Sequence, residues 1–413
     1  MIRRIGVDTC TVERMALAVQ RSGQGFLRKA FTEAELEYCA GRAEKLAGRW
    51  AAKEAVIKCF DNTPICYPRR RIEVLPAPGG APRVSLLEGD AQGAVVQVSI
   101  THQGGIAVAS ALLEMPGAGE EPVAAPAAVR VPQRPLDAHK GTFGTVVVIA
   151  GSRGFTGAAY LASTAAARSG AGLVRLLVAE GIYPILAVKC TEVMATPVDQ
   201  ASPGSVARGA MDLIMQHLDG SEAGVVGPGL GRDRSTWQLV VDLVAQAGQP
   251  LVLDADALNA LAEDRRALSG VAARGPRVLT PHPGEMARLV DRPTAEVQAD
   301  RHSVAAAAAD EWGAVVVLKG ARTIVAGPDG RLSEDPHEVP ALATGGTGDV
   351  LAGLIAGLIA QGSDPFEAAV TGVYVHAEAG RRVSGRLGES GLLASDLLLE
   401  LPRVMQLLRQ KGL

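Results

Sequence analysis

The stretch Ala341–Gly362, ALATGGTGDVLAGLIAGLIAQG, joins a glycine-rich turn to an acidic residue and a long apolar run. Gly345, Gly346 and Gly348 let the backbone approach a ligand closely. The apolar run contains no proline and predicts a buried helix, whose N-terminal amides and dipole favour an anion at the turn. The stretch therefore predicts a cradle for a phosphate group.

Asp349 follows this turn at the start of the predicted helix. A carboxylate beside a bound phosphate is placed to take a proton from an attacking hydroxyl, which is general-base chemistry. The alternative is that Asp349 only caps the N-terminus of a core helix. The residues alone leave both interpretations open.

Other groups of glycine or polar residues also follow strand-like runs. They are GPGLG (227–231), DADALN (254–259), TPHPGE (280–285) and KGART (319–323). Ligands of parallel sheets gather at the carboxyl ends of the strands, so these segments and GGTGD are expected to share one crevice. Singly, each has a plainer explanation, such as helix caps at Asp254 and Asp256 or a surface charge at Lys319.

A third candidate lies near the N-terminus, in the predicted helix LAGRWAAKEAVIKCF. Trp50, Glu54 and Lys58 recur at i, i+4 and i+8, so one helix face presents a carboxylate and an ammonium above an aromatic ring. Such a face suits a metal ion and a phosphate, although an ordinary Glu–Lys surface pair has the same spacing. His102 lies at the HQGG break of a predicted hairpin and is either functional or an incidental turn residue.

The elements that carry these residues fall into two regions. Residues 1–115 predict a strand, three helices and a set of hairpin strands, which indicates an α+β domain. Residues 116–135 are rich in Pro and Ala and predict a semi-extended linker. Residues 136–413 alternate strands and helices, which predicts an α/β domain with a doubly wound, mostly parallel sheet.

Composition excludes some functional classes. The chain has 413 residues, a net charge of −3 and 47% apolar residues, which gives no general reason to bind nucleic acid or an anionic membrane. Its five cysteines lack C-x-x-C spacing and are expected to be reduced thiols in the cytoplasm. The apolar run near Leu351 is too short to span a bilayer.

The motifs of the C-terminal region closely resemble those of the ADP-dependent NAD(P)H-hydrate dehydratase family, which has a ribokinase-like fold. The match runs from GFTGAA through the strand-end segments to GGTGDVLAG and covers nearly all of the chain after His139. The resemblance implies a repair reaction. The ring hydroxyl of a hydrated nicotinamide cofactor is phosphorylated by ADP, which becomes AMP, and is then eliminated as phosphate.

The resemblance also implies roles for single residues. Asp349 would be the base, and the amides of Gly345, Gly346 and Gly348 would stabilise the transferring phosphoryl group. ADP and AMP would contact Lys319, Gly320, Ala321, Arg322, Thr323 and Gly348. The NAD(P)H hydrate would lie against Ala158, Gly231, His282 and Asp349. Glu285 would orient Mg²⁺ through water.

Two further expectations follow from this resemblance. The chain contains no GNNGGDG-type loop, which the epimerase that accompanies this family carries, so it is expected to act on the (6S) epimer alone. A rival interpretation makes the C-terminal region a small-molecule kinase that releases its phosphorylated product.

The N-terminal region resembles the holo-acyl-carrier-protein synthase type of 4′-phosphopantetheinyl transferase. The resemblance is carried in order by GVD (6–8), FTEAEL (31–36), RWAAKEAVIK (49–58) and SITH (99–102). It implies Mg²⁺-dependent transfer of phosphopantetheine from coenzyme A to a serine of an apo acyl carrier protein. Arg69–Arg71 stand where that family usually has a glycine-rich turn.

By position, this second resemblance assigns Asp8 and Glu54 to Mg²⁺, Glu54 and Lys58 to catalysis, and Lys53, Lys58 and His102 to coenzyme A. Basic side chains on the first helix would dock an acidic carrier protein; they are Arg14, Arg21 and Arg28. Related transferases build their sites between subunits, so a homo-oligomer is expected. The alternative is a non-catalytic module that binds coenzyme A or sets the oligomeric state.

Overall fold

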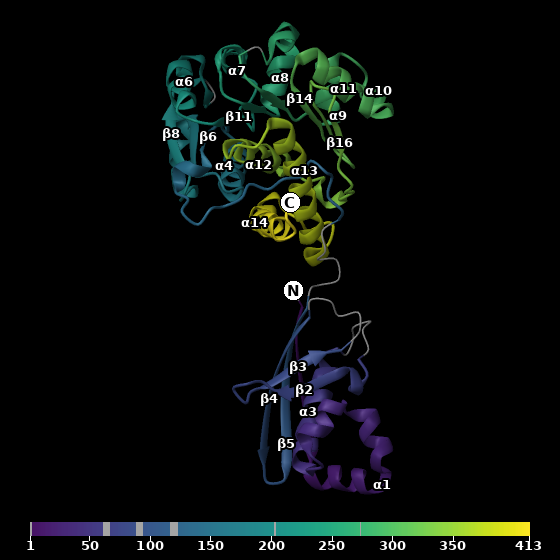
Figure 1. The fold of residues 1–413 in the computed structure, drawn as a ribbon. Coiled ribbons are helices and arrows are strands. Elements are labelled where there is room, and N and C mark those ends of the chain that lie inside the picture. The colour runs from purple at the N-terminus through teal and green to yellow at the C-terminus, as the bar shows by residue number, and fades with distance from the viewer. Residues whose placement is uncertain (1, 61–66, 88–93, 116–122, 202–203, 273) are drawn as a thin grey trace. The chain divides into compact units, whose positions relative to one another are not determined.

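The computed structural model of the chain divides into two compact units, Met1–Glu121 and Pro122–Leu413. The structure describes residues 2–60, 67–87, 94–115, 123–201, 204–272 and 274–413. Figure 1 shows the elements of both units.

The N-terminal unit is an antiparallel sheet with helices packed on one face. The sheet has the strand order β1-β5-β4-β3-β2. Its strands are β1 (Ile2–Thr11), β2 (Ile72–Pro76), β3 (Pro82–Leu86), β4 (Val95–Gln103) and β5 (Ile106–Met115). Its helices are α1 (Val12–Ala30), α2 (Glu33–Cys39), α3 (Ala43–Cys59) and the short 3₁₀ helix η1 (Arg69–Arg71).

Local sequence explains how these elements meet. Thr32 and Glu35 form the predicted capping box at the start of α2. Helix α3 packs directly on β1 and β5. A Cβ atom on Gly6 in β1 would lie 2.0 Å from the carbonyl oxygen of Ala55, so glycine is required for this close approach. Gly6 therefore allows α3 to approach β1 closely, so that Lys58 in the last turn of α3 lies beside Asp8.

The opposite face of this sheet carries exposed apolar side chains. Ile5, Val7 and Val95 are 75%, 51% and 55% exposed. The register places Ile5 opposite Leu112 and Val7 opposite Ser110, on the face away from α3. Within the described residues, no helix covers this face.

The C-terminal unit is built on a nine-stranded sheet with the order β16-β15-β14-β13-β12-β11-β6-β7-β8. Neighbouring strands are parallel from β8 to β14, and β15 and β16 are antiparallel. The strands are β6 (Thr145–Ile149), β7 (Leu173–Ala179), β8 (Met194–Val198), β11 (Ala223–Val226), β12 (Leu251–Leu253), β13 (Arg277–Leu279), β14 (Val315–Leu318), β15 (Ile324–Ala326) and β16 (Leu332–Glu334). Strands β9 (Gln200–Ala201) and β10 (Ser205–Val206) form a separate pair.

Helices cover both faces of this sheet. Helices α4, α12 and α13 pack against one face, and α6, α7, α8 and α11 lie on the other (Figure 1). The helices are α4 (Thr156–Arg168), α5 (Tyr183–Lys189), α6 (Met211–Asp219), α7 (Arg234–Gln246), α8 (Asp256–Glu263), α9 (Pro283–Val290), α10 (Thr294–Ala299), α11 (Arg301–Trp312), α12 (Thr347–Ala360), α13 (Pro365–Leu387) and α14 (Ala394–Gln410). Short 3₁₀ helices occur at 140–143, 180–182, 208–210, 265–270 and 340–342.

Helix α12 is the central helix of this unit, and its residues Val350–Ala360 are buried. It packs tightly on α4, because a Cβ atom on Gly353 would lie 2.0 Å from the carbonyl oxygen of Ala162. The predicted buried helix behind the glycine-rich turn is therefore present. The fold-class predictions are confirmed for both regions.

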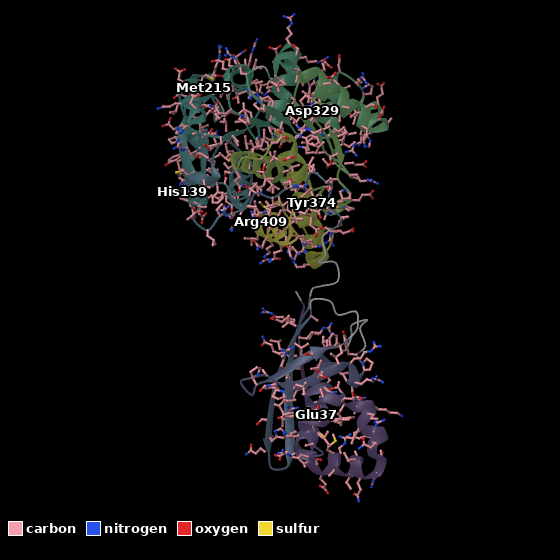
Figure 2. All side chains as sticks on the ribbon, in the orientation of Figure 1. Glu37, His139, Met215, Asp329, Tyr374 and Arg409 are labelled. Atoms are coloured by element: carbon pink, nitrogen blue, oxygen red, sulfur yellow. The ribbon has the colours of Figure 1, made fainter. Side chains whose placement is uncertain are left out.

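The structure differs from the predicted linker over residues 123–135, which pack against the C-terminal unit. Val129 and Val131 belong to its core. Tyr374 Oη of α13 donates to the carbonyl of Val123, and Arg409 Nε of α14 donates to the carbonyl of Pro132 at 2.9 Å. Figure 2 labels the side chains of Tyr374 and Arg409. Residues 116–122 of the predicted linker lie outside the described residues.

Two smaller predictions concern cysteines and membranes. Cys10, Cys39, Cys59 and Cys190 are free thiols, and Cys66 lies outside the described residues. In the described part of the chain, no helix has both the length and the apolarity needed to cross a bilayer. The cytoplasmic location stays a prediction.

Candidate active site

The glycine-rich turn before α12 leaves its backbone open to a ligand. Gly346 is the N-cap residue with φ of 93°, and no side chain caps the helix. A Cβ atom on Gly345 would meet no atom within 4 Å, whereas one on Gly346 would lie 2.6 Å from Cδ1 of Leu161. The N-terminal amides of α12 therefore have no side-chain cap among the described residues and are available to an anion.

Asp349 lies in the first turn of α12 and does not serve as its cap. Burial and the nearby negative charge of Asp254 raise the pKa of Asp349 to about 7, although the positive charge of Lys319 lowers it. A carboxylate with such a pKa is charged above neutral pH and is basic enough to accept a proton from a hydroxyl. This geometry favours the general-base interpretation over the capping interpretation.

Lys319 brings together the ends of three strands. It follows β14, and its Nζ lies 2.7 Å from Oδ1 of Asp254, which follows β12. The same Nζ is 3.9 Å from Oε2 of Glu285, which follows β13. Burial opposes the charge on Lys319, but Asp254 and Glu285 outweigh it and raise the pKa of Lys319. Lys319 is thus a fixed positive charge beside Gly348, where a Cβ atom would lie 3.3 Å from Nζ.

His282 and Glu285 form a capping box at the start of α9. Nδ1 of His282 accepts from the amide of Glu285 at 3.3 Å, and Oε2 of Glu285 accepts from the amide of His282 at 2.8 Å. Burial lowers the pKa of His282, whose side chain is 52% exposed. The structure therefore gives Glu285 a capping bond in addition to its position near Lys319.

The GPGLG segment packs against the start of α4. A Cβ atom on Gly229 would lie 2.9 Å from Cβ of Ala158. Gly231 has φ of 84°, and its amide donates to Oδ2 of Asp256 at 2.8 Å. Ala158 and Gly231 therefore lie in neighbouring segments, and their binding of the hydrated cofactor stays a prediction.

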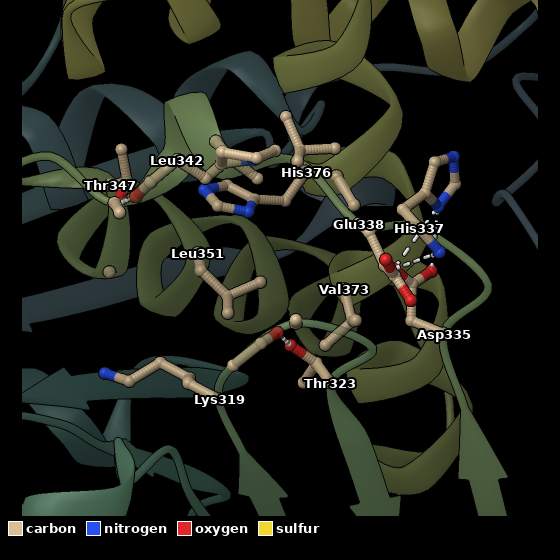
Figure 3. A pocket seen from close by; sticks show the side chains of 17 residues that line it. Lys319, Thr323, Asp335, His337, Glu338, Leu342, Thr347, Leu351, Val373 and His376 are labelled. Atoms are coloured by element: carbon tan, nitrogen blue, oxygen red, sulfur yellow. Dashed lines mark hydrogen bonds and ion pairs between the residues drawn. The ribbon is translucent and has the colours of Figure 1, made fainter. Parts of the chain in front are cut away.

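A pocket of about 410 Å³ extends from Lys319 and Gly348 toward α13 (Figure 3). Gly320, Ala321 and Thr323 of the KGART segment also line it. Arg322 does not line this pocket, and its Nε is ion-paired with Glu334 at 2.7 Å, so its contact with the nucleotide stays a prediction. The apolar part of the wall is formed by Val339, Pro340, Leu342, Ala343, Leu351, Val373 and Ala377.

Asp335, His337 and His376 also line this pocket, and no sequence motif identified them. The side chain of His337 is buried between Oδ1 of Asp335 at 3.0 Å and Oε2 of Glu378 at 3.1 Å. Burial disfavours its charged form, but these carboxylates outweigh burial and raise the pKa of His337 to about 9. The only signal for this cluster was the D-x-H spacing of Asp335 and His337, which is too common to predict a site.

In the N-terminal unit, the predicted metal ligands are paired with cations. Nζ of Lys58 lies 2.8 Å from Oδ1 of Asp8 and donates to the carbonyl of Val7 at 2.8 Å. Arg69 forms an ion pair with Glu54, and its guanidinium lies over the ring of Trp50. The predicted face of α3 is therefore present, but Glu54 and Lys58 are neutralised by partners outside α3, Arg69 and Asp8.

Lys53 is placed differently from the prediction. Its side chain is fully buried, and its Nζ lies 2.5 Å from Oε2 of Glu35 and bonds to the carbonyls of Ala30 and Arg69. Burial lowers the pKa of Lys53 and raises that of Glu35. The assignment of Lys53 to a coenzyme pyrophosphate is therefore corrected, because the ammonium is enclosed in the core.

His102 lies on β4 against α3, and its Nε2 is 3.2 Å from the carbonyl of Glu44. A Cβ atom on Gly48 would lie 2.7 Å from this nitrogen, so glycine makes room for the ring. His102 is exposed to solvent. Its role in binding coenzyme A stays a prediction.

Together, the parallel sheet with an antiparallel edge, the open glycine turn and the partly buried Asp349 define a ribokinase-like enzyme fold. A ribokinase-like superfamily protein from Enterococcus faecalis is similar, with 28% identity, a TM-score of 0.58 and coverage of 67% of this chain and 91% of that chain. The crystal structure of ADP/ATP-dependent NAD(P)H-hydrate dehydratase from Bacillus subtilis, co-crystallised with ATP and Mg²⁺, is 34% identical. It has a TM-score of 0.56 and covers 67% of this chain and 93% of that chain.

Residues 146–403 match the family model described as NAD(P)H-hydrate dehydratase, and the chain belongs to this family. A curated relative, the ADP-dependent (S)-NAD(P)H-hydrate dehydratase of Xanthomonas campestris, is 41% identical over 63% of this chain and 88% of its own length. The bifunctional NAD(P)H-hydrate repair enzyme Nnr of Moorella thermoacetica is 46% identical over 68% of this chain. The chain spans about half the length of that relative, 53%.

The N-terminal unit has its own match. Residues 4–111 match the model of the 4′-phosphopantetheinyl transferase superfamily. Both resemblances stated from the sequence are thereby confirmed.

Proposed function

We propose that the C-terminal unit catalyses ADP-dependent dehydration of (6S)-NAD(P)H hydrate to NAD(P)H, with release of AMP and phosphate. The observation that carries this proposal is the position of Asp349. It is a partly buried carboxylate with a pKa of about 7, next to open helix amides and to the cation of Lys319. The names of the relatives from Xanthomonas campestris and Bacillus subtilis support the same reaction.

In the first step, Asp349 accepts the proton of the ring hydroxyl. The hydroxyl oxygen then forms a bond to the terminal phosphorus of ADP, and the bond between that phosphorus and the bridging oxygen breaks, so AMP leaves with the electron pair. The amides of Gly345, Gly346 and Gly348 stabilise the charge on the transferring group, and Lys319 adds a fixed positive charge beside it.

In the second step, the ring carbon–oxygen bond breaks and phosphate leaves, because phosphate is a far better leaving group than hydroxide. A proton is lost from the neighbouring ring carbon, which restores the double bond of the dihydronicotinamide. Ala158, Gly231 and His282 are proposed to hold the hydrated cofactor, and Lys319, Gly320, Ala321, Arg322, Thr323 and Gly348 to hold ADP.

Magnesium fits this site only in part. No group of three or more His, Cys, Asp or Glu side chains that could hold a metal occurs in the described part of the chain. Mg²⁺ commonly binds through one or two carboxylates and completes its shell with water and phosphate, so Glu285 with the phosphates of ADP is a sufficient donor set. When bound there, Mg²⁺ would neutralise charge on the phosphates.

The test uses hydrated NADH, ADP and the full chain. Recovery of NADH absorbance with equal release of AMP and phosphate supports the proposal, and Asp349→Asn is expected to abolish both. Accumulation of a stable phosphorylated product without NADH would instead identify a small-molecule kinase of the same fold.

A second function is favoured by the N-terminal match and by the α3 face. We propose that residues 1–115 transfer phosphopantetheine from coenzyme A to an apo acyl carrier protein. Asp8 and Glu54 come from adjacent elements, and hard carboxylate oxygens suit Mg²⁺. Because Lys58 and Arg69 occupy these carboxylates, the ligands must displace them, and the released Lys58 then faces the pyrophosphate. Arg14, Arg21 and Arg28 of α1 are proposed to dock the acidic carrier.

The intact mass of an apo acyl carrier protein, measured after incubation with the chain, coenzyme A and Mg²⁺, tests this proposal. A gain of one phosphopantetheine that is lost in Glu54→Gln supports it. Binding of coenzyme A without any gain with several carriers would leave a binding or assembly module.

We also propose that the chain forms a homo-oligomer through the uncovered face of the N-terminal sheet. The exposed Ile5, Val7 and Val95 on that face support self-association, because an apolar sheet face is normally covered. Native mass measurement of Val7→Lys against the unchanged chain tests it: the variant is expected to dissociate.

A further inference from the structure

The pocket beside Lys319 contains polar side chains from several segments, and most of the buried ones are already bonded within the protein. The pairs are Lys319 with Asp254, Thr323 with the carbonyl of Gly320, Thr347 with the carbonyl of Leu342, and Asp335 with His337. These side chains are oriented by bonds within the protein before a ligand binds.

His376 is the exception. It lies on α13 in the pocket wall and is 8% exposed. Its Nε2 is buried and has no hydrogen-bond partner among the described residues. Figure 3 shows its ring near Leu342 and Leu351, with no bond drawn to it. An unpaired buried polar atom costs free energy, and a hydrogen bond from a ligand in the pocket would remove that cost.

The surroundings of His376 determine its chemical form. Burial lowers its pKa to about 4, the backbone of Thr347 opposes this change through a hydrogen bond, and Lys319 adds to it. The ring is therefore neutral at pH 7, with one donor and one acceptor nitrogen. The hydrogen bond to the backbone of Thr347 favours the protonated ring, so the nitrogen that makes this bond is a donor to a carbonyl oxygen. Nε2, which has no partner among the described residues, is then the acceptor nitrogen.

We propose that His376 recognises the base of the bound nucleotide by accepting a hydrogen bond from the exocyclic amino group of adenine. The inference rests on the proposed use of ADP. Lys319 and Gly348 mark the phosphate end of the pocket, and the apolar wall formed by Val339, Leu342 and Val373 suits the faces of a purine ring.

This geometry discriminates between bases. Hypoxanthine has an oxygen in place of the 6-amino group, so two acceptors would face each other in a buried site and both would stay unpaired. A site built to hydrogen-bond one group rejects an analogue that lacks it much more strongly than a purely apolar pocket does. The pocket is therefore expected to prefer ADP to IDP by at least about ten-fold.

The experiment is calorimetric titration of the full chain with ADP and with IDP. The unchanged chain should prefer ADP, and His376→Leu should weaken ADP binding until the two affinities are within about three-fold. Because leucine removes an unpaired polar atom from an apolar wall, the unliganded variant should melt no lower than the unchanged chain. A histidine with a purely structural role would give the opposite result, a lower melting temperature and an unchanged preference.

Val373→Ala is the matched control on the same helix and the same pocket. It should weaken ADP and IDP equally and keep the preference for ADP. If His376→Leu does not fold, His376→Asn carries the test, and an unchanged ratio of ADP to IDP affinity overturns the inference. Equal affinity of the unchanged chain for ADP and IDP also overturns it, whereas failure to bind ADP at all contradicts the proposed function itself.

Discussion

The two candidate sites differ in how their charges are balanced before a ligand binds. In the C-terminal unit, Asp254 and Glu285 share the cation of Lys319, and Asp349 is left as a partly buried carboxylate without a cation of its own. In the N-terminal unit, Asp8 and Glu54 each have a separate basic partner. In the first arrangement the proposed base is available before a ligand binds. In the second, the ligands must first break the ion pairs of Asp8 and Glu54.

The largest expected effect is at the uncompensated carboxylate. Asp349→Asn removes the proposed base and should lower the dehydration rate about a thousand-fold, while ADP binding and the N-terminal reaction are kept. The measurement is single-turnover NADH recovery, with calorimetry of ADP as the control. A loss of less than ten-fold would show that Asp349 is not the base.

A second prediction contrasts the two lysines of α3. Lys53→Met leaves Glu35 buried without its cation, which should destabilise the N-terminal unit by about 3–5 kcal/mol. Lys58→Met breaks an exposed pair and should cost less than about 1 kcal/mol. Hydrogen exchange of α3 amides measures both. Equal protection in the two variants would contradict the structural assignment of Lys53.

The third prediction is a pH dependence. Asp349 must be deprotonated to act, and its pKa is raised to about 7, so the dehydration rate should fall as pH drops below about 7. Removing the negative charge of Asp254 lowers the pKa of Asp349. In Asp254→Asn, the midpoint of the pH–rate profile should therefore move to lower pH, even if the rate itself is reduced. A midpoint that stays in place would show that another group titrates.

The smallest effect is expected at Arg69, whose side chain is 42% exposed. Arg69→Ala frees Glu54 and should tighten binding of coenzyme A with Mg²⁺ by no more than about five-fold, because exposed ion pairs are weak. Arg70→Ala, which removes a neighbouring exposed arginine, is the control. Weaker binding in Arg69→Ala alone would show instead that Arg69 contacts the coenzyme.

The sequence predicted that the polar segments of the C-terminal unit meet, because one rule governs where they lie. Polar segments at the carboxyl ends of parallel strands meet at one edge, so Asp254, Glu285 and Lys319 converge even though they are far apart in the chain. The rule does not tell which oxygen pairs with which nitrogen. It did not predict that Glu285 also serves as a helix cap or that Arg322 pairs with Glu334.

The same reasoning failed for residues whose role depends on how deeply their side chains are buried. Lys53 and Lys58 are both lysines on α3, but only the packing of α1, α2 and η1 determines that Lys53 is enclosed. His337 and His376 lie in an irregular segment and in the middle of a long helix, and no spacing rule links them. Their chemistry comes from neighbours distant in sequence, such as Glu378 for His337.

The segment from Val123 to Pro135 has a practical consequence for protein engineering. It supplies Val129 and Val131 to the core and accepts a hydrogen bond from Tyr374, on the helix that also carries His376. A truncated enzyme that begins at residue 136, where the strand pattern starts, would lose this cover and expose apolar surface on α13. An isolated C-terminal enzyme should therefore be expressed from a start point before Val123.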